Sequence, residues 1–210
     1  MTAQKKRIKA WLSPLAALLV IAAAFLWHYE NDPWGYYWKV PAAEGRLRSQ
    51  VVRTAEGYLG YNEADGSHSK IIDRYNNHEP LAEGYLVKYT DSWCAAFVSA
   101  VAIECGMTEI LPTECSCERQ IGLFQELGRW EETDTIIPLP GDIIYYDWDQ
   151  TKGGECSGWS DHVGIVVGTK WPFLKVIEGN KDDSVAYRVL LIGDRQIRGY
   201  GKPDYTSKVS

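Results

Sequence analysis

The stretch YTDSWCAAFVSAVAIECG, residues 89–106, decides the fold. Its second part is apolar almost all round, with only Ser99 and Glu104 polar in the interior. A helix that is apolar on every side is usually buried in the core. The stretch therefore predicts a buried helix over residues 92–105.

Cys94 lies just inside the start of this predicted helix. Asp91 or Ser92 can serve as the N-cap, and with Ser92 in that role Cys94 is the second helical residue. One interpretation is a small apolar side chain that fills the core. The other is a nucleophile, because a helix N-terminus lowers a thiol pKa and its free N–H groups can bind an oxyanion.

A nucleophilic cysteine needs a base, and His162 is the best placed of the four histidines. It opens a strongly apolar strand directly after a loop rich in glycine and serine. The other three are predicted at a membrane interface or in polar, solvated stretches: His28, His68 and His78. The alternative interpretation is that His162 is a structural residue at a strand end whose ring nitrogens are hydrogen-bonded.

An orienting partner for His162 must be of another type, because no histidine follows it. The motif VIEGN supplies Glu178 and Asn180 on the next predicted strand. Strand alternation puts these two side chains on one face, where either could accept the imidazole N–H. A polar strand-to-turn junction would explain both residues without any catalytic role.

The patterns along the chain predict an α+β domain with helices packed on an antiparallel sheet. Residues 45–59 and 118–127 have helical spacing, in addition to 92–105. The second half is rich in β-branched and aromatic residues and contains turn signals. Strands are predicted over 142–149, 161–169, 174–179 and 185–192.

Five motifs in order, WCAAFVSA, PGDIIYY, DHVGIVVG, VIEGN and IRGYGKPDY, resemble those of the CHAP family, the cysteine- and histidine-dependent amidohydrolases and peptidases of cell-wall enzymes. The resemblance covers residues 45–205. It implies a papain-like fold in which Cys94 is the nucleophile, His162 the base, Glu178 the third residue and Asn180 a possible fourth. It also implies cleavage of an amide bond in peptidoglycan.

Two alternatives to this function remain open from the sequence. The related NlpC family of endopeptidases typically uses a second histidine as its third residue, which this chain lacks after His162. A catalytically silent binding or scaffolding protein at the cell wall would keep the same fold. A redox protein is a poor match, because no C-x-x-C motif is present.

The N-terminal part predicts a single-pass membrane anchor. Residues 1–9 are basic and 10–27 carry no charge, which favours a cytoplasmic N-terminus and a spanning helix. A tether over 28–44 and the hydrolase domain over 45–206 would then lie outside the membrane. A signal peptide cleaved after Ala22-Ala23-Ala24 is the alternative, and it exports the same domain.

The charge balance limits the partners. Beyond residue 28 the chain carries 18 Lys and Arg against 28 Asp and Glu, a net charge of −10. Nucleic-acid binding needs a basic surface, so it is not expected. Peptidoglycan as substrate and the membrane, through the N-terminal helix, are the expected partners.

The remaining cysteines permit up to two disulfides in an exported domain. Cys115 or Cys117 is predicted to pair with Cys156 or Cys105. A metal site is not expected, because a C-x-C pair without a second pair is a poor zinc pattern. No cofactor is expected either.

One polar stretch raises the question of a calcium site. Its candidate ligands do not follow the EF-hand spacing, so a solvated loop is the favoured interpretation. The residues concerned are Asp65, Gly66, His68 and Asp73.

Overall fold

The structure, a computed structural model, describes residues 40–148 and 158–209. The chain divides into two units, Met1–Pro33 and Trp34–Ser210, and all described residues belong to the second. Within the described part, four α-helices accompany a six-stranded antiparallel sheet. The predicted α+β class is therefore confirmed.

The sheet has the strand order β1-β6-β2-β3-β4-β5, and all its pairings are antiparallel. The four predicted strands are present as β2 to β5, while β1 and β6 were not predicted. β6 is five residues long and β1 only two, too short for an alternating pattern to mark them. The strands are β1 (Trp130–Glu131), β2 (Ile143–Tyr146), β3 (His162–Lys170), β4 (Phe173–Lys181), β5 (Ser184–Leu191) and β6 (Ile197–Gly201).

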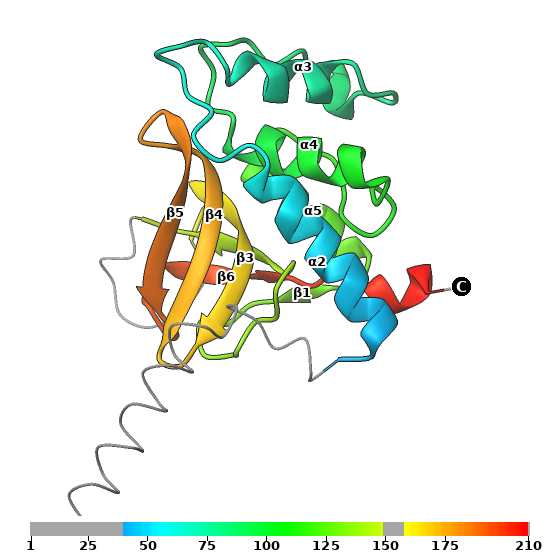
Figure 1. The fold of residues 1–210 in the computed structure, drawn as a ribbon, viewed down its shortest axis with the longest axis vertical. Helices are drawn as coiled ribbons and strands as arrows, with labels where there is room; N and C mark the ends of the chain where they lie inside the picture. Colours follow the sequence, from blue (N-terminus) through cyan, green and yellow to red (C-terminus); the bar gives the residue numbers. More distant parts are fainter. Residues whose placement is uncertain (1–39, 149–157, 210) are drawn as a thin grey trace, which may run out of the picture. The chain divides into compact units, whose positions relative to one another are not determined.

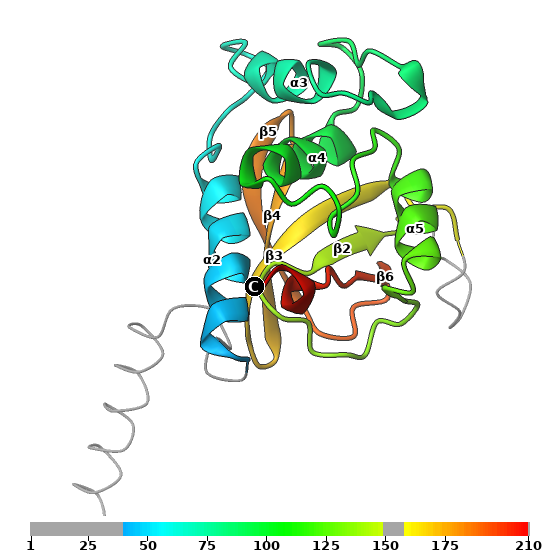
Figure 2. The same cartoon turned by 90° about the vertical axis from the view of Figure 1, so that its right-hand side faces the viewer.

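Helices gather on one side of the curved sheet, and α4 lies against β3 and β4 (Figures 1 and 2). Helix α3 packs on α4 on the side away from the sheet. The three predicted helices correspond to α2, α4 and α5, and no end differs from its predicted position by more than three residues. The helices are α2 (Ala42–Glu56), α3 (Ser69–Asn76), α4 (Cys94–Cys105) and α5 (Cys117–Glu126).

Helix α3 is the main element that the sequence analysis missed. It lies in a polar stretch that was expected to be solvated loop, but it buries Ile71, Ile72 and Tyr75 almost completely. These three residues have helical spacing, so a narrow apolar face was present between the polar residues. Helix α2 also differs, because it begins at Ala42, inside the predicted tether.

The close approach of α4 to β4 depends on Gly179. A Cβ atom at this position would lie 2.4 Å from Cβ of Phe97 and 2.9 Å from the ring of Trp93. Any side chain here would push α4 away from the sheet. The glycine of VIEGN therefore sets the distance between the start of α4 and the end of β4.

The predicted membrane anchor over residues 10–27 lies outside the described residues. Of the helices in residues 40–148 and 158–209, none has the length and apolar character needed to cross a membrane.

Candidate active site

Cys94 is the first residue of α4, and Trp93 occupies the N-cap position. The predicted caps are therefore wrong, Ser92 by one position and Asp91 by two, and Cys94 is the first rather than the second helical residue. The Trp93 side chain does not cap the helix; its buried indole N–H donates to Glu63 Oε1 at 3.0 Å. The N–H groups of the first turn have no intrahelical acceptors, so they remain available beside the Cys94 sulfur.

His162 and Glu178 form a buried pair across β3 and β4. The distance from His162 Nε2 to Glu178 Oε2 is 3.1 Å, and Glu178 has no exposed surface. Gly164 makes room for this contact, since a Cβ there would lie 2.7 Å from Glu178 Cγ. With Nε2 engaged by the carboxylate, Nδ1 is the ring nitrogen left to exchange a proton with Cys94.

Arg188 on β5 holds the other side of the Glu178 carboxylate. Its Nε donates to Oε1 at 2.7 Å and to Oε2 at 3.0 Å. Arg188 is paired with Val176, two residues before Glu178, so the contact is a diagonal cross-strand pair. The sequence contained one indication of this contact: Arg188 is the single cation in the otherwise mostly apolar strand VAYRVLLI.

Two aromatic rings cover His162: Tyr146 at the end of β2 and Trp148 two residues later. Tyr146, the cross-strand partner of His162, stacks on it with ring centroids 5.8 Å apart. Trp148 stacks on Tyr146 at 4.7 Å, and Arg188 lies 4.9 Å above its ring. The imidazole is thus fixed by a carboxylate at one end and by an aromatic wall along its face.

The electrostatics of the pair favour a charged imidazole. Burial lowers the pKa of His162, but hydrogen bonds and charges from Cys94 and Glu178 outweigh burial and raise it to about 9. Burial acts to raise the pKa of Glu178, yet its bonds with His162 and Arg188 leave that pKa below its usual value. Glu178 is therefore a carboxylate that stabilises imidazolium.

Cys117 is a second thiol at the site, and the sequence analysis assigned it only to a disulfide. Its Sγ lies 3.7 Å from Cys94 Sγ, and both side chains are buried. The hydrogen bond from Cys117 is the largest cause of a Cys94 pKa well below its usual value; burial opposes it, and His162 and the Ala95 N–H assist. The same contact raises the pKa of Cys117, so Cys117 keeps its proton and donates.

Asn180, the predicted fourth residue of the site, contacts Glu63 rather than His162. Its side-chain amide donates to Glu63 Oε1 at 3.1 Å, the same oxygen that accepts from Trp93. Glu63 therefore connects the end of β4 to the start of α4. The imidazole of His162 is held by Glu178 rather than by Asn180, and nothing in the polar loop around Glu63 indicated this connection.

One cavity opens next to His162, and a second adjoins it. One, of about 400 Å³, is lined by Trp148, His162, Asn180, Lys181, Asp182, Arg188 and Gln196. The other, of about 350 Å³, shares Trp148, Arg188 and Gln196 with it and continues along β5. The first cavity is lined mainly by polar side chains, whereas the second adds apolar side chains of β4 and β5, among them Phe173, Val189 and Leu191.

The other described cysteines do not reach the site. Cys94, Cys105, Cys115 and Cys117 are all free thiols, so a disulfide between Cys105 and either cysteine of the C-x-C pair is not formed in the structure. Cys105 is at the far end of α4, where its sulfur contacts Thr54 Oγ1 at 3.3 Å. Predicted pairing with Cys156 lies outside the described residues.

The stretch considered for calcium is organised by its own hydrogen bonds. His68, expected to be solvated, is buried, and its Nε2 lies 3.0 Å from the carbonyl of Tyr89. Asp65 accepts from the Ser67 N–H, and Asp73 accepts from the Tyr89 hydroxyl. Among the described residues, no group of three or more His, Cys, Asp or Glu is arranged to hold a metal ion.

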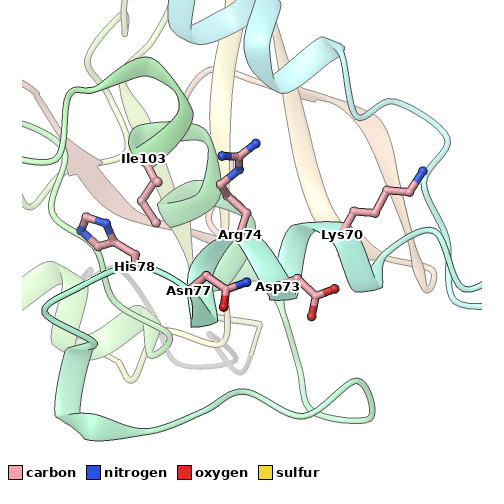
Figure 3. A pocket seen from close by; sticks show the side chains of 6 residues that line it. All are labelled: Lys70, Asp73, Arg74, Asn77, His78 and Ile103. Atoms are coloured by element: carbon pink, nitrogen blue, oxygen red, sulfur yellow. The ribbon is translucent and has the colours of Figure 1, made fainter.

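A further cavity of about 390 Å³ lies over α3 and the end of α4 (Figure 3). Its side chains point in different directions rather than toward one centre, and it contains none of the residues around Cys94. We assign it no role in the chemistry. It is lined by Lys70, Asp73, Arg74, Asn77, His78 and Ile103.

Comparisons with known proteins found no match to this chain. No protein-family model matches the sequence, no curated protein matches it, and no solved structure matches it.

Replacing Glu178 with glutamine is expected to lower the pKa of His162 from about 9. The amide can still accept a hydrogen bond, but the negative charge that stabilises imidazolium is lost. An NMR titration of the His162 ring would measure the change. Glu63→Gln, which alters a carboxylate that contacts Trp93 and Asn180 instead, is the matched control. An unchanged His162 pKa in Glu178→Gln would contradict the assigned contact.

Proposed function

We propose that this chain is a papain-like cysteine hydrolase of the CHAP type that cleaves an amide bond in peptidoglycan. The observation that carries the proposal is one arrangement: a cysteine of lowered pKa at the start of a buried helix, facing a His162–Glu178 pair on two adjacent strands. The motif resemblance supplies the substrate class. The N-terminal segment over 10–27 would hold the enzyme near the wall, with its catalytic domain outside the membrane.

The geometry supports the following reaction. The Cys94 thiolate attacks the amide carbonyl, and N–H groups at the start of α4 donate to the oxyanion that forms. Protonated His162 gives its proton to the leaving nitrogen, so the amine departs and a thioester remains on Cys94. His162 then takes a proton from water, whose oxygen attacks the thioester and releases a carboxylate and the Cys94 thiolate.

Two features favour this enzyme over the alternatives. The orienting residue is the carboxylate Glu178, whereas the NlpC type typically has a second histidine. A catalytically silent scaffold has no use for a thiol whose pKa is lowered, or for a base whose pKa is raised. The extended cavities along Trp148 and Arg188 also suit a glycopeptide polymer.

The test is digestion of purified peptidoglycan by the full chain, followed by mass spectrometry of the soluble products. Hydrolysis of an amide adds one water and leaves a new amine and a new carboxylate, and the fragment masses identify the bond. We expect such fragments from the wild-type chain. A folded chain that releases none from walls of several peptide compositions would contradict the proposal.

The activity is expected to follow a bell-shaped pH profile with an upper limb at about 9. The active form pairs a Cys94 thiolate with protonated His162. As pH rises through the His162 pKa of about 9, the proton needed by the leaving nitrogen is lost. As pH falls through the lowered pKa of Cys94, the thiolate is lost. Initial rates against pH would measure both limbs; a rate that keeps rising well above pH 9 would contradict this assignment.

A further inference from the structure

The sulfur atoms of Cys94 and Cys117 are in direct contact inside the site. They are 3.7 Å apart, and each belongs to the first residue of a helix, α4 and α5. A disulfide requires about 2.05 Å between sulfurs, so a small movement of the two side chains would close the bond. Both thiols are buried, with 6% of Cys94 and 8% of Cys117 exposed.

We infer that Cys94 and Cys117 form a reversible disulfide, with Cys117 as the resolving cysteine that switches the hydrolase off and protects its nucleophile. The oxidant is a peroxide. Formation of the bond depends only on the two thiols, whereas the loss of hydrolysis that it causes rests on the function proposed above.

The chemistry proceeds in two balanced steps. The Cys94 thiolate attacks a peroxide oxygen and breaks the O–O bond; with hydrogen peroxide this gives a sulfenic acid at Cys94 and hydroxide. The Cys117 sulfur then attacks the sulfenic sulfur, the S–O bond breaks, and hydroxide leaves with the proton of Cys117 as water. The two sulfurs together lose two electrons, and the peroxide gains them. A dithiol reverses the bond by exchange.

The other described cysteines lack these properties. Burial raises the pKa of both Cys105 and Cys115, which keeps them as unreactive thiols. Cys105 lies at the opposite end of α4 from Cys94, about 16 Å along the axis at 1.5 Å per residue. Cys115 is half-buried beside Tyr75 rather than beside Cys94.

Cleavage after glutamate, combined with one variant, allows the cross-link to be assigned. No Lys or Arg lies between Cys94 and Cys117, but Glu104, Glu109 and Glu114 do, so cleavage after glutamate puts the two cysteines on separate peptides. Cys115 stays on the same peptide as Cys117. The variant Cys115→Ser removes that ambiguity and serves as the matched control for Cys117→Ser.

The experiment treats the reduced full chain with hydrogen peroxide, alkylates free thiols and maps the peptides. We expect a Cys94–Cys117 cross-link in the wild type and in Cys115→Ser that dithiothreitol reverses. In Cys117→Ser, Cys94 should instead be trapped by dimedone as a sulfenic acid or be oxidised further. A cross-link from Cys94 to Cys115 or Cys156, or oxidised Cys94 beside an alkylated Cys117, would overturn the inference.

Hydrolysis of peptidoglycan by the same samples gives the second readout. Release of fragments should fall to background on oxidation of the wild type and of Cys115→Ser, and return on reduction. Chains that cross-link but never release fragments when reduced would refute the proposed function and leave the disulfide standing. Chains that hydrolyse but never cross-link would refute the disulfide alone.

Discussion

Replacing Cys94 with serine is expected to reduce hydrolysis of peptidoglycan by on the order of 10⁴-fold or more, the scale seen when a serine protease loses the nucleophile of its triad. The site stabilises a thiolate through Cys117, His162 and the Ala95 N–H. A serine hydroxyl remains protonated under the same influences, because its own pKa is far above that of a thiol. The measurement is the initial rate of fragment release from purified peptidoglycan.

Cys105→Ser is the matched control for this prediction. Cys105 is the last residue of the same helix, and it is partly exposed, with its sulfur against Thr54. Its replacement should leave the rate near that of the wild type. Circular dichroism and urea unfolding of both variants would show that α4 remains folded. Wild-type rates in Cys94→Ser would mean that Cys94 is only a buried core residue.

Replacing Arg48 with alanine is expected to destabilise the fold by about 3–5 kcal/mol, the usual cost of removing one partner of a buried ion pair. Arg48 is 5% exposed and joins α2 to the sheet. Its Nε contacts Glu44 and its Nη1 contacts Asp142, each at 2.8 Å, and Asp142 has no exposed surface. Alanine would leave both buried carboxylates without the cation that pairs with them.

Arg48 makes two further contacts, with a backbone carbonyl and with a buried aromatic ring. Its Nη1 donates to the carbonyl of Pro140 at 3.0 Å, and its guanidinium lies 4.5 Å from the ring centre of Tyr205. Arg53→Ala, on the exposed side of the same helix, should change stability by no more than about 0.5 kcal/mol. Unfolding in guanidinium chloride would give the free energy of unfolding of each variant. Equal stabilities of the two variants would show that the buried cluster contributes nothing.

The residues of the candidate site that the sequence predicted are those with a strong local pattern. Cys94 stands out because an apolar helix follows it, and His162 because it opens an apolar strand. Glu178 was one of two candidates on the next strand, and the structure brings it, rather than Asn180, into contact with the imidazole. Strand alternation alone could not choose, since it puts residues 178 and 180 on the same side.

The residues that the sequence missed depend on contacts between separate elements. Cys117 meets Cys94 only because α5 begins beside the start of α4. Arg188 meets Glu178 because β5 pairs with β4 in one register, and a lone cation in an apolar strand was its only signal. Glu63 lies in a polar loop that gave no indication of a partner.

The fold was predicted at the level of class and of the longer elements. Helix α3 was missed because polar residues surround its narrow apolar face, and β1 because two residues carry no periodicity. The glycines of DHVGIVVG and VIEGN were part of the motifs noted in the sequence, but their role emerged only from packing. Gly164 makes room for Glu178, and Gly179 brings α4 against β4.

The most direct test of the account is to look for the thioester on Cys94 itself. Acid quenching of the full chain during digestion of peptidoglycan, followed by peptide mapping, would show which side chain carries an acyl group. The account predicts a wall-derived acyl mass on the Cys94 peptide that hydroxylamine removes. Release of fragments while Cys94 stays unmodified, and remains fully open to alkylation throughout turnover, would contradict it.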